Sequence, residues 1–192
     1  MRRLLKFSLC LFCLTGLLSC YTNKFYSKND YSLYQKDFHL SDSTLLRTDG
    51  VYLQTKIWTN ENGGKERIPK ERKIYKFYNT GQANMILDLN NSLKTNQQYI
   101  DAVNTRIKNK VTPTLFQGYY RLNGNRIVIQ SVNPPRNVFS YAYAVLESNK
   151  LIIVKSTIEG KGKIDDKFFT DYYKEYYTFV STGDDSYMEP NW

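Results

Sequence analysis

The three cysteines offer the most specific chemistry in this chain, and all of them lie within the first 20 residues. Cys10 and Cys13 have the spacing of redox and metal-binding pairs. They lie, however, in an apolar run over residues 7–18 that follows a basic start, which is the layout of a secretory signal peptide. The run is shorter than the roughly 20 apolar residues that a membrane-spanning helix needs. We therefore expect the pair to be removed with the signal.

The end of this signal carries a second pattern. Leu17, Leu18, Ser19 and Cys20 resemble the lipobox of bacterial lipoproteins. The resemblance implies cleavage before Cys20, with residues 1–19 as signal peptide. It also implies a thioether-linked diacylglycerol and an amide-linked acyl chain on Cys20, and two or more chains hold a protein stably at a membrane. We expect a lipid-anchored protein of the bacterial cell envelope, at the outer membrane. The alternative is an ordinary secretory signal in which Cys20 lies near the cleavage point by chance.

The remaining residue types exclude the common catalytic and metal centres. His39 is the only histidine, and Cys20 would be the only cysteine left after cleavage, which excludes the usual triads and Cys/His zinc sites. The adjacent pairs Asp165-Asp166 and Asp184-Asp185 are typical of solvated turns. No glycine-rich phosphate loop follows a predicted strand. We predict no catalytic residue, no metal, no cofactor and no disulfide, in a protein that is not an enzyme.

The charge of the mature chain is moderate. The full sequence carries 27 basic and 18 acidic residues, and removal of Arg2, Arg3 and Lys6 with the signal leaves 24 basic residues and a net charge of +6. Such a balance can attract nucleic acid or anionic lipid headgroups. Because a tethered envelope protein lies beside a membrane, we expect the membrane as partner and no nucleic acid.

Periodicity divides the mature chain into a polar tether and entry segment at 20–48, one β domain at 49–182 and a tail at 183–192. Alternating apolar and polar residues predict eight strands. They cover residues 51–58, 73–78, 82–89, 118–122, 125–129, 138–147, 150–158 and 172–182. The inward side of the last strand stays open, because both of its faces carry aromatic rings.

Turn residues predict three hairpins and their registers. In the first, the loop Asn79-Thr80-Gly81 places Phe77 opposite Ala83 and Tyr75 opposite Met85. In the second, an Asn123-Gly124 turn pairs Leu122 with Asn125 and places Tyr120 opposite Ile127. In the third, pairing of Glu147 with Lys150 places Tyr143 opposite Val154 and Tyr141 near Ser156. Each hairpin is expected to turn its heavier apolar face inward.

One helix interrupts the strands. Thr95 and Gln98 have the spacing of a capping box, and Tyr99, Ile100, Val103 and Ile107 recur at helical spacing as far as about Asn109. We interpret the helix as a brace or lid on the sheet, with a connector that has no role in ligand access as the alternative.

The strand openings Gly50-Val51-Tyr52 and Gly118-Tyr119-Tyr120, and the phrase over residues 118–129, resemble the lipocalin-like domains of small bacterial lipoproteins. The resemblance implies an all-β fold, a single antiparallel up-and-down barrel of about eight strands with one helix. A barrel suits adjacent hairpins because closure removes exposed strand edges. A two-sheet β-sandwich is the alternative.

The aromatic content suggests what such a barrel could do, because eight strands enclose a space that side chains fill or that holds one small ligand. Our first hypothesis is a small hydrophobic or amphipathic ligand inside the barrel, against Tyr75, Phe77, Phe116, Tyr120, Tyr141 and Tyr143. Equally open is a core that these rings simply fill. A hypothesis of another class is an envelope structural or assembly component that meets a protein partner through an aromatic patch such as Tyr172, Tyr176 and Trp192.

The anchor is directly testable. Substitution Cys20→Ser removes the sulfur that would accept diacylglycerol, so we expect metabolic labelling of the protein with palmitate to disappear. Labelling that persists in this variant would contradict the lipoprotein assignment.

Overall fold

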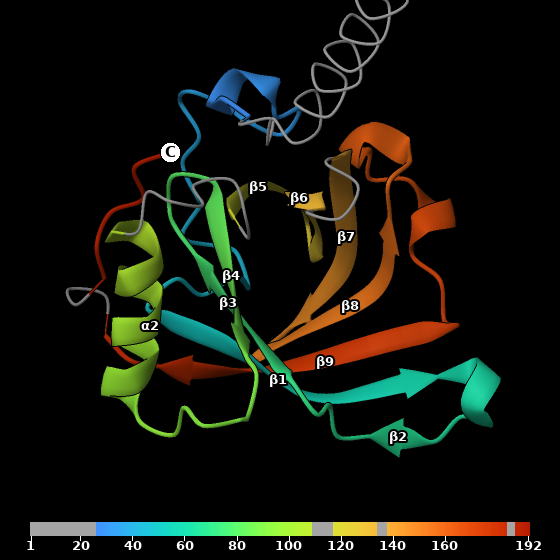
Figure 1. The fold of residues 1–192 in the computed structure, drawn as a ribbon. Coiled ribbons are helices and arrows are strands. Elements are labelled where there is room, and N and C mark those ends of the chain that lie inside the picture. The colour runs from blue at the N-terminus through green and yellow to red at the C-terminus, as the bar shows by residue number, and fades with distance from the viewer. Residues whose placement is uncertain (1–25, 109–116, 134–137, 184–186) are drawn as a thin grey trace, which may run out of the picture.

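The computed structural model describes residues 26–108, 117–133, 138–183 and 187–192 (Figure 1). Its strands are β1 (Gly50–Thr59), β2 (Glu66–Arg67), β3 (Arg72–Phe77), β4 (Gln82–Asp88), β5 (Gln117–Asn123), β6 (Arg126–Asn133), β7 (Val138–Glu147), β8 (Lys150–Thr157) and β9 (Tyr173–Ser181). The helix α2 spans Asn96–Lys108, and short 3₁₀ helices are η1 (Lys28–Asp30), η2 (Asn60–Asn62), η3 (Gly160–Gly162) and η4 (Asp166–Phe168).

The strands close into an antiparallel eight-stranded barrel, which confirms the predicted fold class over the sandwich. Strands β1 and β3 to β9 each pair with the next, and β9 returns to pair with β1 from Gly50–Ser181 to Thr59–Tyr173. The short β2 adds to the far end of β1 through Ile57–Arg67 and Trp58–Glu66. Closure leaves β1 and β9 without free edges along most of their length.

Two of the hairpins depart from their predicted registers. In the second, Leu122 pairs with Ile127 rather than with Asn125. The loop residues are Gly124 and Asn125, and Gly124 has φ +60° at the first loop position, as a type II′ turn requires. Since the shift is by two residues, the inward faces stay as predicted. The first hairpin pairs as predicted, Phe77 with Ala83 and Tyr75 with Met85.

The third hairpin starts from the predicted pair Glu147–Lys150, but the side that faces inward was predicted wrongly. A bulge between Tyr143 and Ala144 places Tyr143 opposite Lys155 and Tyr141 opposite Thr157. Ala142, Ala144 and Leu146 face the interior, while Tyr141 and Tyr143 belong to a cluster outside the barrel. Both faces of β7 are apolar because both are covered, so side-chain size alone could not identify the inner one.

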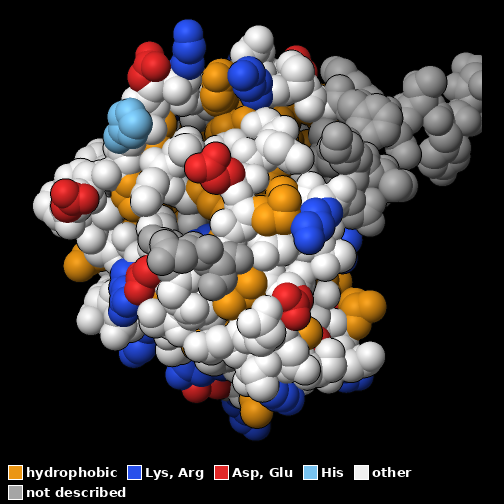
Figure 2. All heavy atoms as spheres, turned by 90° about the vertical axis from the view of Figure 1, so that its left-hand side faces the viewer, with side chains coloured by type: hydrophobic (Ala, Val, Ile, Leu, Met, Phe, Trp, Pro, Cys, Tyr) orange, Lys and Arg blue, Asp and Glu red, His pale blue; other side chains and the backbone are white. Residues whose placement is uncertain are grey.

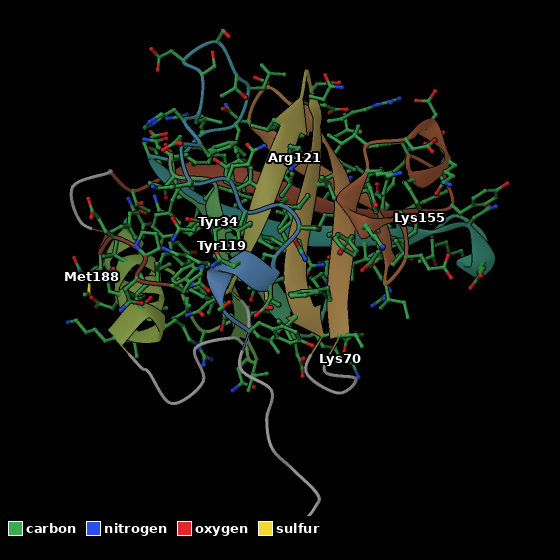
Figure 3. All side chains as sticks on the ribbon, turned by 90° about the horizontal axis from the view of Figure 1, so that it is seen from above. Tyr34, Lys70, Tyr119, Arg121, Lys155 and Met188 are labelled. Carbon is green, nitrogen blue, oxygen red and sulfur yellow. The ribbon has the colours of Figure 1, made fainter. Side chains whose placement is uncertain are left out.

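The outer cover over β5 to β7 includes part of the segment that we expected to be a tether. Tyr31 and Leu33 are buried against the wall, and Leu33 N and Ser32 Oγ donate to Gln130 Oε1 at 2.9 and 3.2 Å. Figure 3 shows this segment lying across the strands, with Tyr34 beside Tyr119, ring to ring at 5.2 Å. Residues 26–34 are therefore part of the domain, because a buried glutamine and an apolar wall hold them.

Residues 38–48 of the same predicted tether cover one end of the barrel, which we call the capped end. Phe38 packs edge-on against Tyr120 at 5.3 Å and lies so close to the Gly81 turn that a β-carbon there would meet its ring at 2.9 Å. Leu46 joins the interior cluster, and Arg47 N donates to Tyr52 Oη at 2.9 Å. The opposite end, where β1 ends and β2 lies, we call the β2 end.

The helix confirms its predicted capping box and buried face. Thr95 N donates to Gln98 Oε1 at 3.0 Å, Gln98 N donates to Thr95 Oγ1 at 3.3 Å, and all four predicted apolar residues are buried. They pack on the outward residues Val51, Leu53 and Ile74 of β1 and β3. The predicted tail is also packed in part, since Trp192 O accepts from Gln82 Nε2 at 2.9 Å. Among the described residues, no helix is long and apolar enough to cross a membrane.

A buried ion pair fixes the start of β3 to the end of β4. Arg72 Nη2 lies 2.8 Å from Asp88 Oδ2, and Asp88 also accepts from the backbone N–H groups of Ser92 and Leu93. Burial alone would raise the pKa of Asp88, but these hydrogen bonds outweigh it and lower the pKa below its ordinary value.

This pair makes the domain sensitive to acid. Because the folded-state pKa of Asp88 is depressed, its contribution is full above the unfolded-state pKa of about 4 and is lost as the pH falls through the folded-state pKa. We expect Asp88→Asn to lower the free energy of unfolding by about 2 kcal/mol at neutral pH. The variant should also lose part of the acid dependence of urea unfolding. Asp37→Asn, at an exposed position, is the control, and an equal effect of both variants would contradict this role.

Candidate ligand site in the barrel interior

The interior contains a continuous series of aromatic rings that starts at the capped end. From Phe38 it passes through Tyr120, Phe77 and Tyr75 to Tyr177, with successive ring centroids 5.3, 5.3, 5.8 and 5.4 Å apart. Three of the rings predicted to line a ligand site, Tyr75, Phe77 and Tyr120, are thus brought together inside the barrel.

Near the capped end these rings form a packed core. Tyr120 Oη donates to Tyr78 O at 2.7 Å, and the Tyr52 ring contacts both Phe77 and Phe179. Tyr52, Phe77 and Tyr120 are almost completely buried. Burial raises the pKa of the Tyr120 hydroxyl above its ordinary range. This half of the interior fits the alternative in which the rings fill the core.

The other half contains a buried carboxylate. The Glu175 side chain, only 6% exposed, projects inward from β9 between Tyr173 and Tyr177. Gln54 Nε2 donates to Glu175 Oε2 at 2.9 Å, and Lys73 Nζ lies 2.9 Å from Oε1 and 3.2 Å from Oε2. The hydroxyls of Tyr173 and Tyr177 donate to one oxygen each. Four side chains from β1, β3 and β9 therefore hold a single carboxylate.

The carboxylate affects its phenol neighbours. Burial, followed by the nearby Tyr75 and Glu175, raises the pKa of Tyr177 well above its ordinary value. Burial and the negative charge of Glu175 raise the pKa of Tyr173 in the same way. Both phenols therefore keep their protons and donate them to Glu175, while the Lys73 ammonium offsets the buried negative charge.

Sequence reasoning missed this cluster because the inward side of the last strand was left open. The sequence did contain a signal, because Tyr173, Glu175 and Tyr177 alternate and so share one face of the last strand. Gln54 in the first strand was a possible hydrogen-bond partner for this carboxylate. Only the pairing of β9 with β1, which sets Tyr177 opposite Gln54, identifies the interior as that side.

Several side chains of the inner wall are partly exposed toward the β2 end. The Lys73 side chain is 37% exposed, and Tyr75, Met85 and Ala142, which face inward by register, are only partly buried. The ammonium of lysine has three donors, and among the described residues its hydrogen bonds go to Glu175 alone. An acceptor group of a ligand could therefore bind Lys73 while an apolar group lies against Tyr75.

The other predicted site residues lie elsewhere. Tyr143 stacks outside the barrel on Phe168 at 4.5 Å, and Tyr141 Oη lies near Gln130, so neither lines the interior. Phe116, Cys20, the predicted signal peptide and the pair Asp184-Asp185 lie outside the described residues. Asp165 Oδ1 accepts a hydrogen bond from the backbone N–H of Lys167, and Asp166 forms an ion pair with Arg126. The first contact stabilises a turn and the second lies at the surface.

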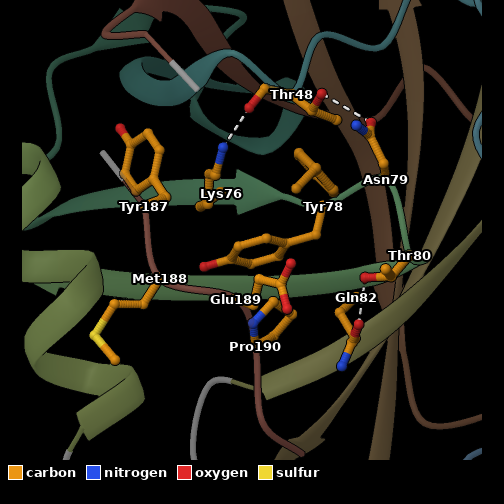
Figure 4. A pocket seen from close by; sticks show the side chains of 11 residues that line it. Thr48, Lys76, Tyr78, Asn79, Thr80, Gln82, Tyr187, Met188, Glu189 and Pro190 are labelled. Carbon is orange, nitrogen blue, oxygen red and sulfur yellow. Dashed lines mark hydrogen bonds between the residues drawn. The ribbon is translucent and has the colours of Figure 1, made fainter. Parts of the chain in front are cut away.

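The remaining candidates, which are the single histidine and a surface hollow, lie apart from the interior cluster. His39 lies at the surface in Figure 2, where acidic and basic side chains are mixed over the face that carries α2. Figure 4 shows a hollow of about 310 Å³ between the β3–β4 hairpin and residues 187–190, where Lys76 Nζ donates to Thr48 O. Within the described parts of the chain, no group of three or more His, Cys, Asp or Glu side chains is placed to hold a metal ion.

No protein-family model matches this chain, and comparison with the curated proteins and with the solved structures found no significant match.

The Glu175 cluster should contribute strongly to stability. Substitution Glu175→Ala leaves Lys73 and two phenols without their acceptor, so we expect a loss of about 3 kcal/mol in the free energy of unfolding by urea. The exposed pair Lys56–Glu66 is the matched control, and Glu66→Ala should cost less than about 1 kcal/mol. A double substitution Lys73→Met with Glu175→Leu should recover part of the loss. Similar costs for Glu175→Ala and Glu66→Ala would refute this role.

Proposed function

We propose that this protein is a lipid-anchored, non-enzymatic lipoprotein of the bacterial cell envelope, held at the outer membrane through Cys20, whose barrel binds a small amphipathic molecule. The observation that carries the binding proposal is the partly exposed polar cluster around Glu175, which lies at the end of the aromatic series farthest from the capped end. Lys73 and Tyr173 supply hydrogen-bonding groups, while Tyr75 and Met85 supply apolar contact on the same inner wall.

The arrangement favours a ligand with an acceptor group at one end. Glu175 already has its donors, so an added cation would have to displace Lys73, whereas a carboxylate, sulfonate or carbonyl would meet the remaining Lys73 protons. Because the capped half of the barrel is packed, the apolar part of the ligand must be short or flat. A ring or short chain against Tyr75 satisfies this limit.

A probe with this chemistry tests the proposal. 1-Anilinonaphthalene-8-sulfonate joins flat rings to a sulfonate, and its fluorescence rises in apolar surroundings. We expect saturable fluorescence with the full-length protein in detergent, above that of the detergent alone, with affinity about tenfold lower in Lys73→Met, since a hydrogen bond to a charged group contributes about 1.5 kcal/mol or more. Ala142→Trp, which adds bulk to the interior, should abolish binding.

Thr178→Trp introduces the same side chain at an exposed outward position of β9 and should leave binding unchanged. Thermal melting verifies that each variant is folded. Binding that is absent from the wild type, or equal in the Ala142 and Thr178 variants, would exclude the interior site. That outcome would favour the other candidate, an envelope assembly component that meets a protein partner, for which the packed aromatic core provides a rigid scaffold.

A further inference from the structure

The exposed apolar side chains of this domain gather at one end of the barrel. Ile68 follows β2, Leu89 follows β4, Val138 begins β7, Ile158 follows β8 and Tyr172 precedes β9. All five positions lie at the β2 end, because the antiparallel registers place the ends of β1, β4 and β8 beside the beginnings of β3, β7 and β9. We call these five residues the apolar rim.

The rim is well exposed. Ile68 is 82% exposed and Tyr172 is 71% exposed. Of the large exposed hydrophobic side chains in the described residues, only Leu45 and Met188 lie elsewhere. Leu45 belongs to the segment of the capped end, and Met188 lies beside α2, where its N–H donates to Asn104 Oδ1. Exposed apolar residues concentrated on one face indicate an interaction surface.

The described chain also begins at this end. The Tyr26 ring contacts the Phe139 ring at 4.5 Å, and Phe139 is the second residue of β7. Tyr26 follows Cys20 by only six positions, so a fully extended chain spans at most about 20 Å between them. The barrel is itself about 20–25 Å long for strands of this length and ordinary tilt.

From these observations we propose that the apolar rim rests in the surface of the membrane and that the β2 end of the barrel faces the bilayer. The proposal rests on the lipid anchor at Cys20. With the capped end toward the bilayer, the six residues would have to run the whole length of the barrel in full extension, whereas with the β2 end toward the bilayer they need not.

The form of the rim also fits a lipid surface better than a protein partner. Its side chains extend from separate strand ends around the barrel rather than from one groove, so a broad planar surface can contact them together. Exposed charges of both signs, such as Lys70 and Glu71, lie among them, which favours apolar insertion over attraction to anionic lipid. In this orientation the partly exposed Lys73 and Tyr75 would face the bilayer, so an amphipathic ligand could enter from it.

Site-specific fluorescence tests the orientation. Ile68→Cys and the matched control Leu45→Cys, which places the thiol at an exposed apolar position of the capped end, are expressed as the full chain. Each is labelled with a thiol-reactive nitrobenzoxadiazole dye and reconstituted into vesicles of phosphatidylethanolamine and phosphatidylglycerol that contain brominated acyl chains. We expect bromolipid quenching at position 68 to exceed that at position 45 by about threefold or more, because only a side chain inserted to the acyl boundary is quenched strongly.

Two further measurements separate the outcomes. The difference between positions 68 and 45 should persist at about 1 M salt, where electrostatic attraction is screened. In the second measurement the dye is attached at Ile158→Cys, and the double substitution Ile68→Glu, Tyr172→Glu is added. This protein should remain on the vesicles through its anchor, while bromolipid quenching of the dye at position 158 decreases. Equal quenching at positions 45 and 68 in anchored protein would overturn the proposed orientation. Reaction of the dye with Cys20 in the unsubstituted chain would instead show that its sulfur carries no lipid, and so would refute the anchor itself.

Discussion

Closure of the sheet by the pairing of β9 with β1 is the constraint on which the rest of the structure depends. It removes the strand edges, and it separates one face of every strand into an enclosed interior. The same pairing places Glu175 inside, beside the neighbouring strands β1 and β3 that supply Gln54 and Lys73. A buried carboxylate without partners would be strongly destabilising, so the interior chemistry and the closure are coupled. The barrel closes in a register in which this carboxylate has donors.

The outer wall is covered over much of its area as well. The helix α2 packs on the outside of β1 and β3, while residues 26–34 pack on β5 to β7. Both layers are fixed by specific polar contacts as well as by apolar area, such as Gln130 with the N–H of Leu33. Consequently many strands carry apolar side chains on both faces. The domain is thus larger than its strands and includes segments with no regular period of their own.

A further segment, residues 38–48, divides the interior into two unlike halves. The capped half, which Phe38 and Leu46 close, is an aromatic core, whereas the half toward the β2 end contains charged and hydroxyl groups with partial exposure. The proposed ligand site, the apolar rim and the point where the described chain begins all lie toward the same end. This coincidence links the proposed binding function to the proposed anchor, because a molecule that partitions into the membrane would reach the site directly.

The sequence by itself determined the local elements. The capping box of Thr95 and Gln98, the Gly81 loop with its register, and the set of eight strands all follow from residues near one another in the chain, since turn geometry and helix caps are local. Tertiary structure alone decided which face of β7 and β9 points inward. Both faces of each strand carry apolar or aromatic side chains, so only the elements packed against a face distinguish the inner one from the outer one. Tertiary structure therefore moved Tyr141 and Tyr143 outside the barrel and brought Glu175 into the site. The assembly of Gln54, Lys73 and Glu175 joins residues up to 121 positions apart, a distance over which no local pattern can act.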